Sequence, residues 1–173
     1  MNDPNRNPDY KPGNKAAGAL IVTATLALAS TVIKPWEGKR NNTYLDIVGV
    51  PTVCYGQTGP SIKMGQRYTN AECEQMLADA LPEYYGHVER CILRNAKVPL
   101  EINEVAALVS FTYNVGPGGV CGSTLQKHAI AGNKSQMCGQ LMRWVYAGGD
   151  EPVKGLVNRR KAEYAMCMGK GYE

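Results

Sequence analysis

Six cysteines scattered along the chain constrain its fold more than any other feature of the sequence. They are Cys54, Cys73, Cys91, Cys121, Cys138 and Cys167. None of them forms a C-x-x-C pair, and the histidines His87 and His128 do not lie at zinc-finger spacings from them, so we expect no metal site. An even number of dispersed cysteines favours disulfides and an oxidising compartment. Fifteen pairings of six cysteines are possible, and six buried thiols in a cytosolic protein are the alternative.

The length and charge of the chain suit one globular domain with a substantial core. The 173 residues carry nineteen Lys and Arg against fifteen Asp and Glu, a formal net charge of +4. The basic residues do not line one face with aromatic residues between them, so the sequence predicts no nucleic-acid partner. A mild basic excess suits an anionic polymer such as a cell wall and an ordinary surface equally well.

The first third of the chain contains two unusual segments. Residues 1–15 are polar and rich in Pro and Asn, which predicts disorder. Residues 16–33 carry no charge, and their strongly apolar residues are outnumbered by Ala, Gly, Thr and Ser. As a helix this segment would be about 27 Å long, just short of a hydrocarbon core of about 30 Å. It is therefore a marginal membrane span.

The remaining pattern predicts a small sheet followed by helices. Pro35 is expected to interrupt the first helix, and the β-branched and aromatic stretch Thr43–Tyr55 predicts a hairpin or three short strands. Capping boxes at 69–72 and 123–126 open two helices, the first interrupted or restarted at Pro82 and the second ending at Gly132. A helix introduced by Pro99 ends before residue 116, and two more cover about 135–146 and 156–168. One short sheet against many helices predicts an α+β fold.

Three polar residues follow the apolar segment at close spacing: Glu37, then Asp46, then Thr52. Two carboxyls and a hydroxyl suit hydrolysis of a glycosidic bond. One carboxylic acid protonates the leaving oxygen, while a carboxylate manages the attacking water or the positive charge that develops on the sugar. As isolated residues, a solvated Glu at a helix end, a turn Asp and a strand Thr would look the same.

Four separated segments together resemble the phage-type lysozymes, the T4-lysozyme-like muramidases of glycoside hydrolase family 24. The order Glu, eight residues, Asp, five residues, Thr is similar to their catalytic triad. SFTYNVGP (110–117), RWVYAGGD (143–150) and GLVNRRKAEYAMCM (155–168) resemble later segments of the same family, in the same order. The resemblance implies a lysozyme-like catalytic domain over residues 34–173, with a small sheet, a mainly helical lobe and an apolar helix in front of them.

The resemblance also implies roles for five residues. Glu37 would be the general acid, favoured in its protonated form by apolar surroundings to which Trp36 could contribute. Asp46 would orient the water or stabilise the transition state, and Thr52 would hold the water on the opposite face of the sugar, with inversion as the family's usual outcome.

Arg159 matches the family's arginine that pairs with the acid. Its alternative is a solvated helix face on which Arg159 and Arg160 pair with Glu163. Asn114 could bind an N-acetyl group of the glycan or cap its helix, and the cap is preferred.

Related endolysins carry cysteines in couples, which implies the pairs Cys54–Cys73, Cys91–Cys121 and Cys138–Cys167. One departure concerns Gln57, which follows Tyr55 and Gly56 where most relatives have a histidine. The structural ion pair that the histidine often forms is therefore in doubt here.

The resulting hypothesis is an endolysin of the signal-anchor-release kind. It would cut the β-1,4 bond between N-acetylmuramic acid and N-acetylglucosamine in peptidoglycan without a cofactor, as a monomer, causing host lysis. Residues 16–33 would carry it through the Sec translocon into the host inner membrane, facing the periplasm, and later release it. The alternatives are a lytic transglycosylase, a non-catalytic wall-binding protein on the same fold, and a signal peptide cleaved after Ala27-Leu28-Ala29.

Overall fold

The computed structural model describes residues 15–46 and 48–170. The segment predicted to be disordered, 1–15, therefore lies outside the described residues except for Lys15, at which the first helix begins. The elements in chain order are α1 (Lys15–Glu37), β1 (Arg40–Leu45), β2 (Pro51–Cys54), β3 (Gln57–Thr58), α2 (Asn70–Val88), the π-helix η1 (Glu89–Leu93), α3 (Ile102–Val115), the 3-10 turn η2 (Pro117–Gly119), α4 (Thr124–Ala131), α5 (Lys134–Leu141) and α6 (Lys154–Cys167). The predicted α+β fold is confirmed.

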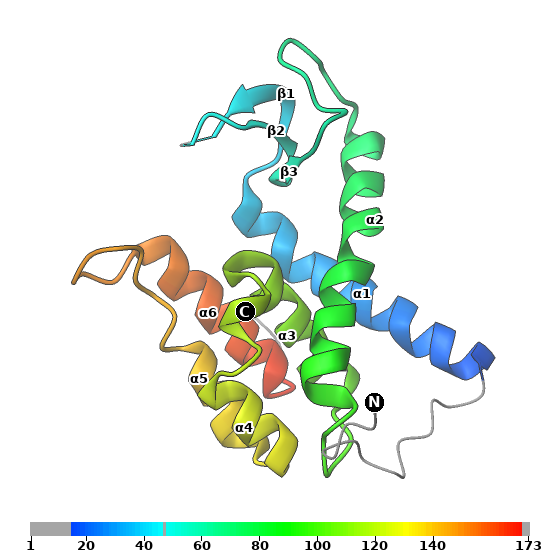
Figure 1. Cartoon of the computed structure of the whole chain (residues 1–173), viewed down its shortest axis with the longest axis vertical. Helices are drawn as coiled ribbons and strands as arrows, with labels where there is room; N and C mark the ends of the chain where they lie inside the picture. Colours follow the sequence, from blue (N-terminus) through cyan, green and yellow to red (C-terminus); the bar gives the residue numbers. More distant parts are fainter. Residues whose placement is uncertain (1–14, 47, 171–173) are drawn as a thin grey trace.

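The three short strands form a small lobe of their own. They pair antiparallel in the order β1-β2-β3, with Thr52 opposite Tyr44 on one side and Thr58 on the other. Figure 1 shows this lobe at one end of the molecule, with α2 running from it down into the helical lobe. The prediction of a small sheet over 43–55 is thus confirmed, with the third strand just beyond it.

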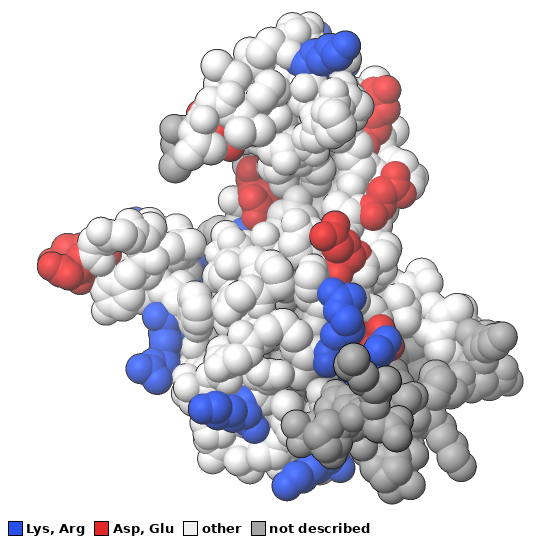
Figure 2. Space-filling model, viewed as in Figure 1, with Lys and Arg blue, Asp and Glu red and all other residues white. Residues whose placement is uncertain are grey.

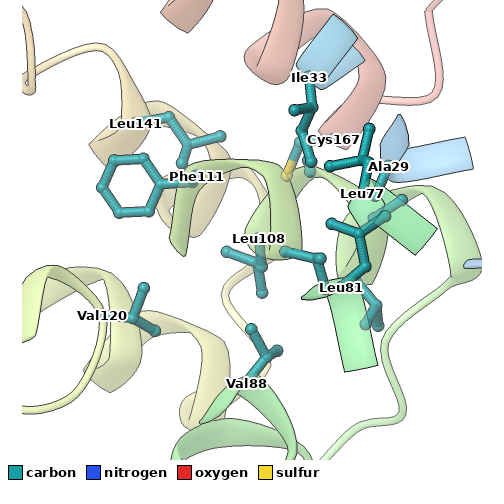
Figure 3. Close-up of a cluster of buried hydrophobic side chains, with 14 of the residues drawn as sticks. Ala29, Ile33, Leu77, Leu81, Val88, Leu108, Phe111, Val120, Leu141 and Cys167 are labelled. Atoms are coloured by element: carbon teal, nitrogen blue, oxygen red, sulfur yellow. The ribbon is translucent and has the colours of Figure 1, made fainter. Parts of the chain in front are cut away.

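Helix α3 lies at the centre of the helical lobe. It packs against α1, α2 and α6, and every residue from Glu104 to Thr112 is buried. Side chains from several helices complete the core around it, among them Leu77, Leu81, Leu141 and Cys167 (Figure 3). A helix apolar on all sides requires such a position, because each of its faces must meet another element.

Helix α1 belongs to this core through its second half only. Thr25, Ala29 and Ile33 are almost fully buried, whereas Leu20 and Ile21 near its start are exposed. Figure 1 shows the first turns of α1 extending beyond the other helices. By length and composition alone, 18–37 could also cross a membrane, with a mean hydropathy of 1.5. The apolar segment predicted at 16–33 is therefore the larger part of a longer helix.

Two prolines that were expected to end or interrupt a helix lie inside one instead. Pro35 lies in the last turn of α1, and Pro82 lies inside α2. Both prolines are exposed. Because a proline has no N–H, the carbonyls of Thr31 and Ala78, four residues earlier, receive no helical hydrogen bond, and these two residues are exposed as well. Water can satisfy such carbonyls, so the cost of about 3 kcal/mol for a proline is offset by the helix faces packed on either side of it.

The predicted helix ends are confirmed in most places. Thr69 and Glu72 form the expected capping box, and Gly132 ends α4 in a left-handed conformation. The second box is only half formed. Ser123 accepts from the backbone of Gln126, but the Gln126 side chain accepts from Gly122 and donates to the carbonyl of residue 91.

Helix α5 ends at Leu141 rather than near residue 146. Beyond it Trp144 packs edge-on against Phe111, with ring centroids 5.4 Å apart, so a tertiary contact takes the chain out of the helix.

The three disulfides confirm the implied pairing. Cys54–Cys73 joins β2 to α2, Cys91–Cys121 joins η1 to the loop before α4, and Cys138–Cys167 joins α5 to α6. Their Cα–Cα distances of 5.1, 5.5 and 5.7 Å lie within the usual range for such bonds.

Candidate active site

Glu37, the last residue of α1, is held by an arginine from the far end of the chain. Its Oε1 accepts a hydrogen bond from Arg159 Nη1 at 2.5 Å, and its side chain is only 19% exposed. The other oxygen, Oε2, lies beside the turn between β2 and β3, where a Cβ built on Gly56 would meet it at 3.6 Å. One carboxyl oxygen of Glu37 is thus occupied by the helical lobe, and the other lies against the sheet lobe.

Arg159 is the centre of a buried polar cluster. Its Nε donates to Glu163 Oε1 at 3.2 Å and its Nη2 to the carbonyl of Ser110 at 3.3 Å, while the Ser110 hydroxyl donates to the same Glu163 oxygen. Both interpretations of the NRRKAEY run are therefore realised together: Arg159 contacts Glu37, and Arg159 and Arg160 both pair with Glu163. The helix face is buried rather than solvated.

The charges in this cluster balance. Arg159 and Arg160 face Glu37 and Glu163, so a second carboxylate competes with Glu37 for the Arg159 guanidinium. Burial raises the pKa of Glu163, against the effect of the two arginines, and burial lowers the pKa of Arg160 to about 10. Removing one member would leave a buried charge without its partner.

The turn between β2 and β3, beside Glu37, is held by hydrogen bonds that the sequence does not predict. Gln57 Oε1 accepts from the backbone N–H of Tyr55, and its Nε2 donates to the hydroxyl of Tyr113 at 2.9 Å. That hydroxyl donates in turn to the carbonyl of Tyr55 at 2.6 Å. Gln57 thus joins the sheet to α3 through neutral hydrogen bonds.

Two tyrosine rings lie near Glu37. Tyr84 and Tyr113 pack together with ring centroids 4.8 Å apart. Burial is the main cause that raises the pKa of both hydroxyls, and the negative charge of Glu37 adds to it. Glu37 thus lies among neutral aromatic groups, with Arg159 and Gly56 beside its two oxygens. Trp36 lines a groove of about 420 Å³ with Pro35 and Met166.

Asp46 directly follows β1, and its side chain is fixed by the turn that it begins. Its Oδ1 accepts from the backbone N–H groups of Val48 at 2.9 Å and Val50 at 2.8 Å. Among the described residues, Oδ2 has no recorded hydrogen bond. The carboxylate is therefore held in one orientation with one oxygen available.

Thr52 lies on β2, and it shares a hydrogen-bond acceptor with Asp46. The carbonyl of Val50 accepts both from the Thr52 hydroxyl and from the Asp46 N–H, each at 3.0 Å. Because the Thr52 proton is used in this way, its oxygen can only accept from a further group. Thr52 is 4% exposed.

Asn114 does not cap its helix, which corrects the preferred interpretation. The cap of α3 is Gly116, whose φ of +78° suits glycine. Asn114 is exposed in the last turn before it, and its Oδ1 accepts from Arg160 Nη2 at 2.8 Å.

The space-filling view shows the molecule hollowed on one side between the sheet lobe and the helical lobe (Figure 2). Glu37 is the last residue of α1, just before the chain enters the sheet lobe, and Asp46 and Thr52 belong to the sheet lobe. The structure thus pairs Asp46 with Thr52, and Glu37 with Arg159. Tyr113 and Ser110 could have been identified from SFTYNVGP, in which both lie, and the spacing of Glu163 from the two arginines places it beside them. The hydrogen bond between Gln57 and Tyr113 has no signal in the sequence.

Comparisons with known sequences give a consistent result. A family model described as Phage lysozyme matches residues 34–163. A SAR-endolysin of Enterobacteria phage PA-2 is 40% identical over 160 residues, which cover 89% of this chain and 94% of the relative. A SAR-endolysin of Pseudomonas phage phiKMV is 42% identical over 149 residues, or 84% of this chain and 89% of the relative.

Solved structures are similar over the same range. An endolysin from the Escherichia coli O157:H7 phage FAHEc1 matches with a TM-score of 0.74 and 32% identity, covering 84% of this chain and 94% of its own. A mutant of P22 lysozyme matches with a TM-score of 0.72 and 27% identity, covering 81% and 94%.

Proposed function

This chain belongs to the phage lysozyme family, and we propose that it is a muramidase that cuts the β-1,4 bond between N-acetylmuramic acid and N-acetylglucosamine in peptidoglycan. Membership of the family supports lysis of the host cell wall. The observation that carries the finer proposal is the arrangement of Glu37. One of its oxygens is bound by a buried arginine and the other lies at the junction of the two lobes.

Glu37 is proposed as the general acid. Arg159 fixes Oε1, so that Oε2 is the oxygen that presents the proton to the glycosidic oxygen. As the C–O bond breaks, the leaving sugar takes that proton, and the remaining sugar develops the charge of an oxocarbenium ion. The rigid Arg159–Glu163–Ser110 cluster supports this role because a proton donor must be held in a fixed place.

Asp46 and Thr52 are proposed to bind the attacking water. Thr52 can only accept from it, and Asp46 Oδ2 can accept its other proton. A water that donates both protons has a lone pair left for the anomeric carbon. Attack from the face opposite to the leaving group inverts the configuration. Asn114, which is exposed in the last turn of α3, is proposed as a residue that binds an N-acetyl group of the glycan.

We further propose that residues 16–33 are a signal-anchor-release segment, with residues 34–173 as the catalytic domain. The segment would carry the chain through the Sec translocon into the host inner membrane, and the released enzyme would act in the periplasm as a monomer. The relatives named SAR-endolysins support this proposal. Three disulfides support an oxidising compartment.

The hydroxyl groups of the segment are consistent with both environments. Thr23, Thr25, Ser30 and Thr31 each donate to a carbonyl of the preceding turn, at 2.7 to 2.9 Å. In lipid no hydroxyl proton would lack a partner, while the small apolar surface keeps the cost of leaving the membrane low.

A cleaved signal peptide is the competing interpretation. Cleavage before Ser30 would remove Thr25 and Ala29, both buried in the core. This loss favours a chain that keeps the segment. The intact mass of the soluble periplasmic enzyme decides: a chain starting at Ser30 would contradict the release proposal.

Lysis of chloroform-treated Gram-negative cells tests the enzymatic proposal. We expect Glu37→Gln to abolish lysis with an unchanged circular dichroism spectrum, because the change removes the proton and little volume. Glu83→Gln, at an exposed position of α2, is the matched control and should lyse normally. Substantial lysis by the Glu37 variant would contradict the acid assignment, and no lysis by the wild-type chain would favour a wall-binding protein.

A further inference from the structure

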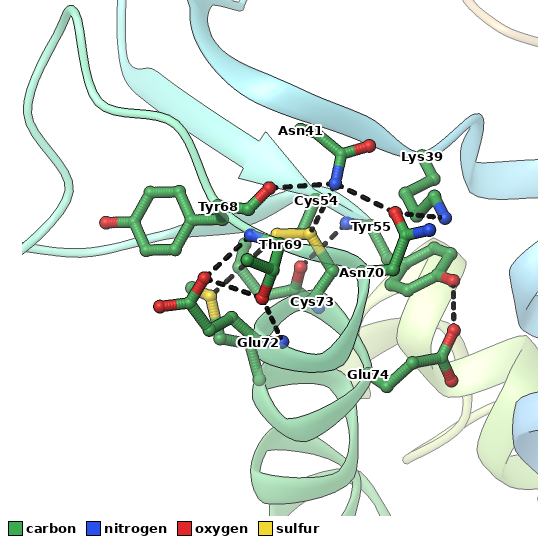
Figure 4. Close-up of a disulfide and its surroundings, with 12 residues drawn as sticks. Lys39, Asn41, Cys54, Tyr55, Tyr68, Thr69, Asn70, Glu72, Cys73 and Glu74 are labelled. Atoms are coloured by element: carbon green, nitrogen blue, oxygen red, sulfur yellow. Dashed lines mark hydrogen bonds between the residues drawn. A yellow bond between two sulfur atoms is a disulfide. The ribbon is translucent and has the colours of Figure 1, made fainter.

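The last residue of β2 and the residue that follows it contact two consecutive residues of α2. Cys54 forms a disulfide with Cys73, and the hydroxyl of the next residue, Tyr55, donates to Oε1 of the next residue, Glu74, at 2.5 Å. Figure 4 shows the two links side by side. The end of β2 is therefore bound to the first turns of α2 by a covalent bond and a hydrogen bond in succession.

The backbone at this place is in an unusual conformation. Cys54 has a φ of +57°, the single positive φ among the described residues other than glycine. Such a conformation costs about 1–3 kcal/mol and persists where the surroundings impose it. Here the disulfide and the Tyr55 contacts impose it, and the chain turns from β2 into β3 within two residues.

Glu74 also reaches the last turn of α1. It forms an ion pair with Lys34, one turn before Glu37. Both side chains are more than a third exposed, so the ion pair by itself contributes at most about 1 kcal/mol. Of the two contacts of Glu74, the hydrogen bond from Tyr55 is the stronger, because its acceptor is charged and Tyr55 is buried.

Every polar group of Tyr55 has a partner. Its hydroxyl binds Glu74, its N–H binds Gln57, and its carbonyl binds Tyr113. The residue that follows is Gly56, which lies against Glu37 Oε2. Fixing Tyr55 therefore fixes the backbone beside the oxygen proposed to carry the catalytic proton.

We infer that Tyr55 and Glu74 are positioning residues for Glu37: together they hold the Tyr55–Gly56 backbone and the last turn of α1 in register on α2. The inference rests on the proposed function of Glu37. Neither residue is proposed to touch the substrate. Their loss should therefore change the turnover rate and leave the affinity for the glycan unaltered.

The test is steady-state hydrolysis of purified peptidoglycan by the full chain. Displacement of a catalytic group by about 1 Å can cost up to about a hundredfold, so we expect Tyr55→Phe and Glu74→Ala each to lower kcat about tenfold, with KM within about twofold. Glu74→Gln keeps an oxygen that accepts from Tyr55, so it should retain more activity than Glu74→Ala.

Tyr68→Phe is the matched control. Its hydroxyl donates to Gln66 within the sheet lobe and is exposed, so kcat should not change. The folded fraction of each variant, measured by circular dichroism, converts the rates to rates per folded molecule.

The inference is overturned if Tyr55→Phe has the wild-type kcat per folded molecule, or if its loss appears in KM instead. It is also overturned if Glu74→Gln is no better than Glu74→Ala. Failure of the proposed function is a different result, because the wild-type chain itself would then release no soluble glycan fragments.

Discussion

The second half of α1 is part of the folded core, and Ile33→Ala measures how much it contributes. Ile33 is fully buried, next to Ala29, Leu77 and Cys167 in the cluster of Figure 3. Truncating a buried Ile to Ala costs about 2–5 kcal/mol from lost transfer free energy and the cavity left behind. We expect about 3 kcal/mol here, which lowers the Tm by about 6–12 °C in a chain of this size.

The assay is denaturant unfolding of the soluble full-length chain, followed by circular dichroism. Leu20→Ala is the control from the same helix, because Leu20 is 72% exposed and its truncation should change the free energy of unfolding by less than about 0.5 kcal/mol. Both changes remove a comparable amount of apolar surface from a membrane span, so only docking onto the catalytic lobe separates them. Equal stability of the two variants would refute the claim that α1 completes the core.

Three further outcomes are expected. The native chain should show no thiol that reacts with iodoacetamide, since all six cysteines are paired, and six reactive thiols would contradict the three disulfides. Asp46→Asn and Thr52→Val should reduce lysis while the chain stays folded, with Thr58→Val as the strand control; unchanged lysis by both variants would remove them from the water site. Replacing the exposed Thr23 and Thr31 by Leu should retain the chain in the membrane fraction and delay lysis, and normal release would argue against a weakly apolar anchor.

The sequence predicts the fold well wherever a local interaction decides the structure. The capping box at Thr69 and the helix ends at Gly116 and Gly132 depend on residues next to them in the chain, and all are observed. The β-branched stretch near Thr52 likewise forms the sheet. These features need no knowledge of the distant parts of the molecule.

The errors arise where tertiary packing overrides a local signal. Pro35 and Pro82 do not break their helices, because the faces beside them are buried and the carbonyls they free are exposed. Gln126 has several possible partners, and its side chain binds the backbone of a distant residue in preference to completing its own capping box.

The site is only partly readable from the sequence for the same reason. The contact between Glu37 and Arg159 spans 122 residues, and only the family resemblance predicts it. The alternative for Arg159 placed Glu163 on a solvated face, but Glu163 is fully buried, with Ser110 and two arginines as partners. Asn114 binds Arg160 in preference to capping its helix, a choice that depends on how α3 and α6 pack.

The most direct test of the central claim is the fate of water in the reaction. Digestion of purified peptidoglycan in water labelled with heavy oxygen, followed by mass spectrometry of the fragments, distinguishes the two ways of cutting the same bond. We predict reducing N-acetylmuramic acid ends that carry one labelled oxygen per cleaved bond, and no product with Glu37→Gln. Fragments with 1,6-anhydro ends and no label would contradict hydrolysis and identify a transglycosylase.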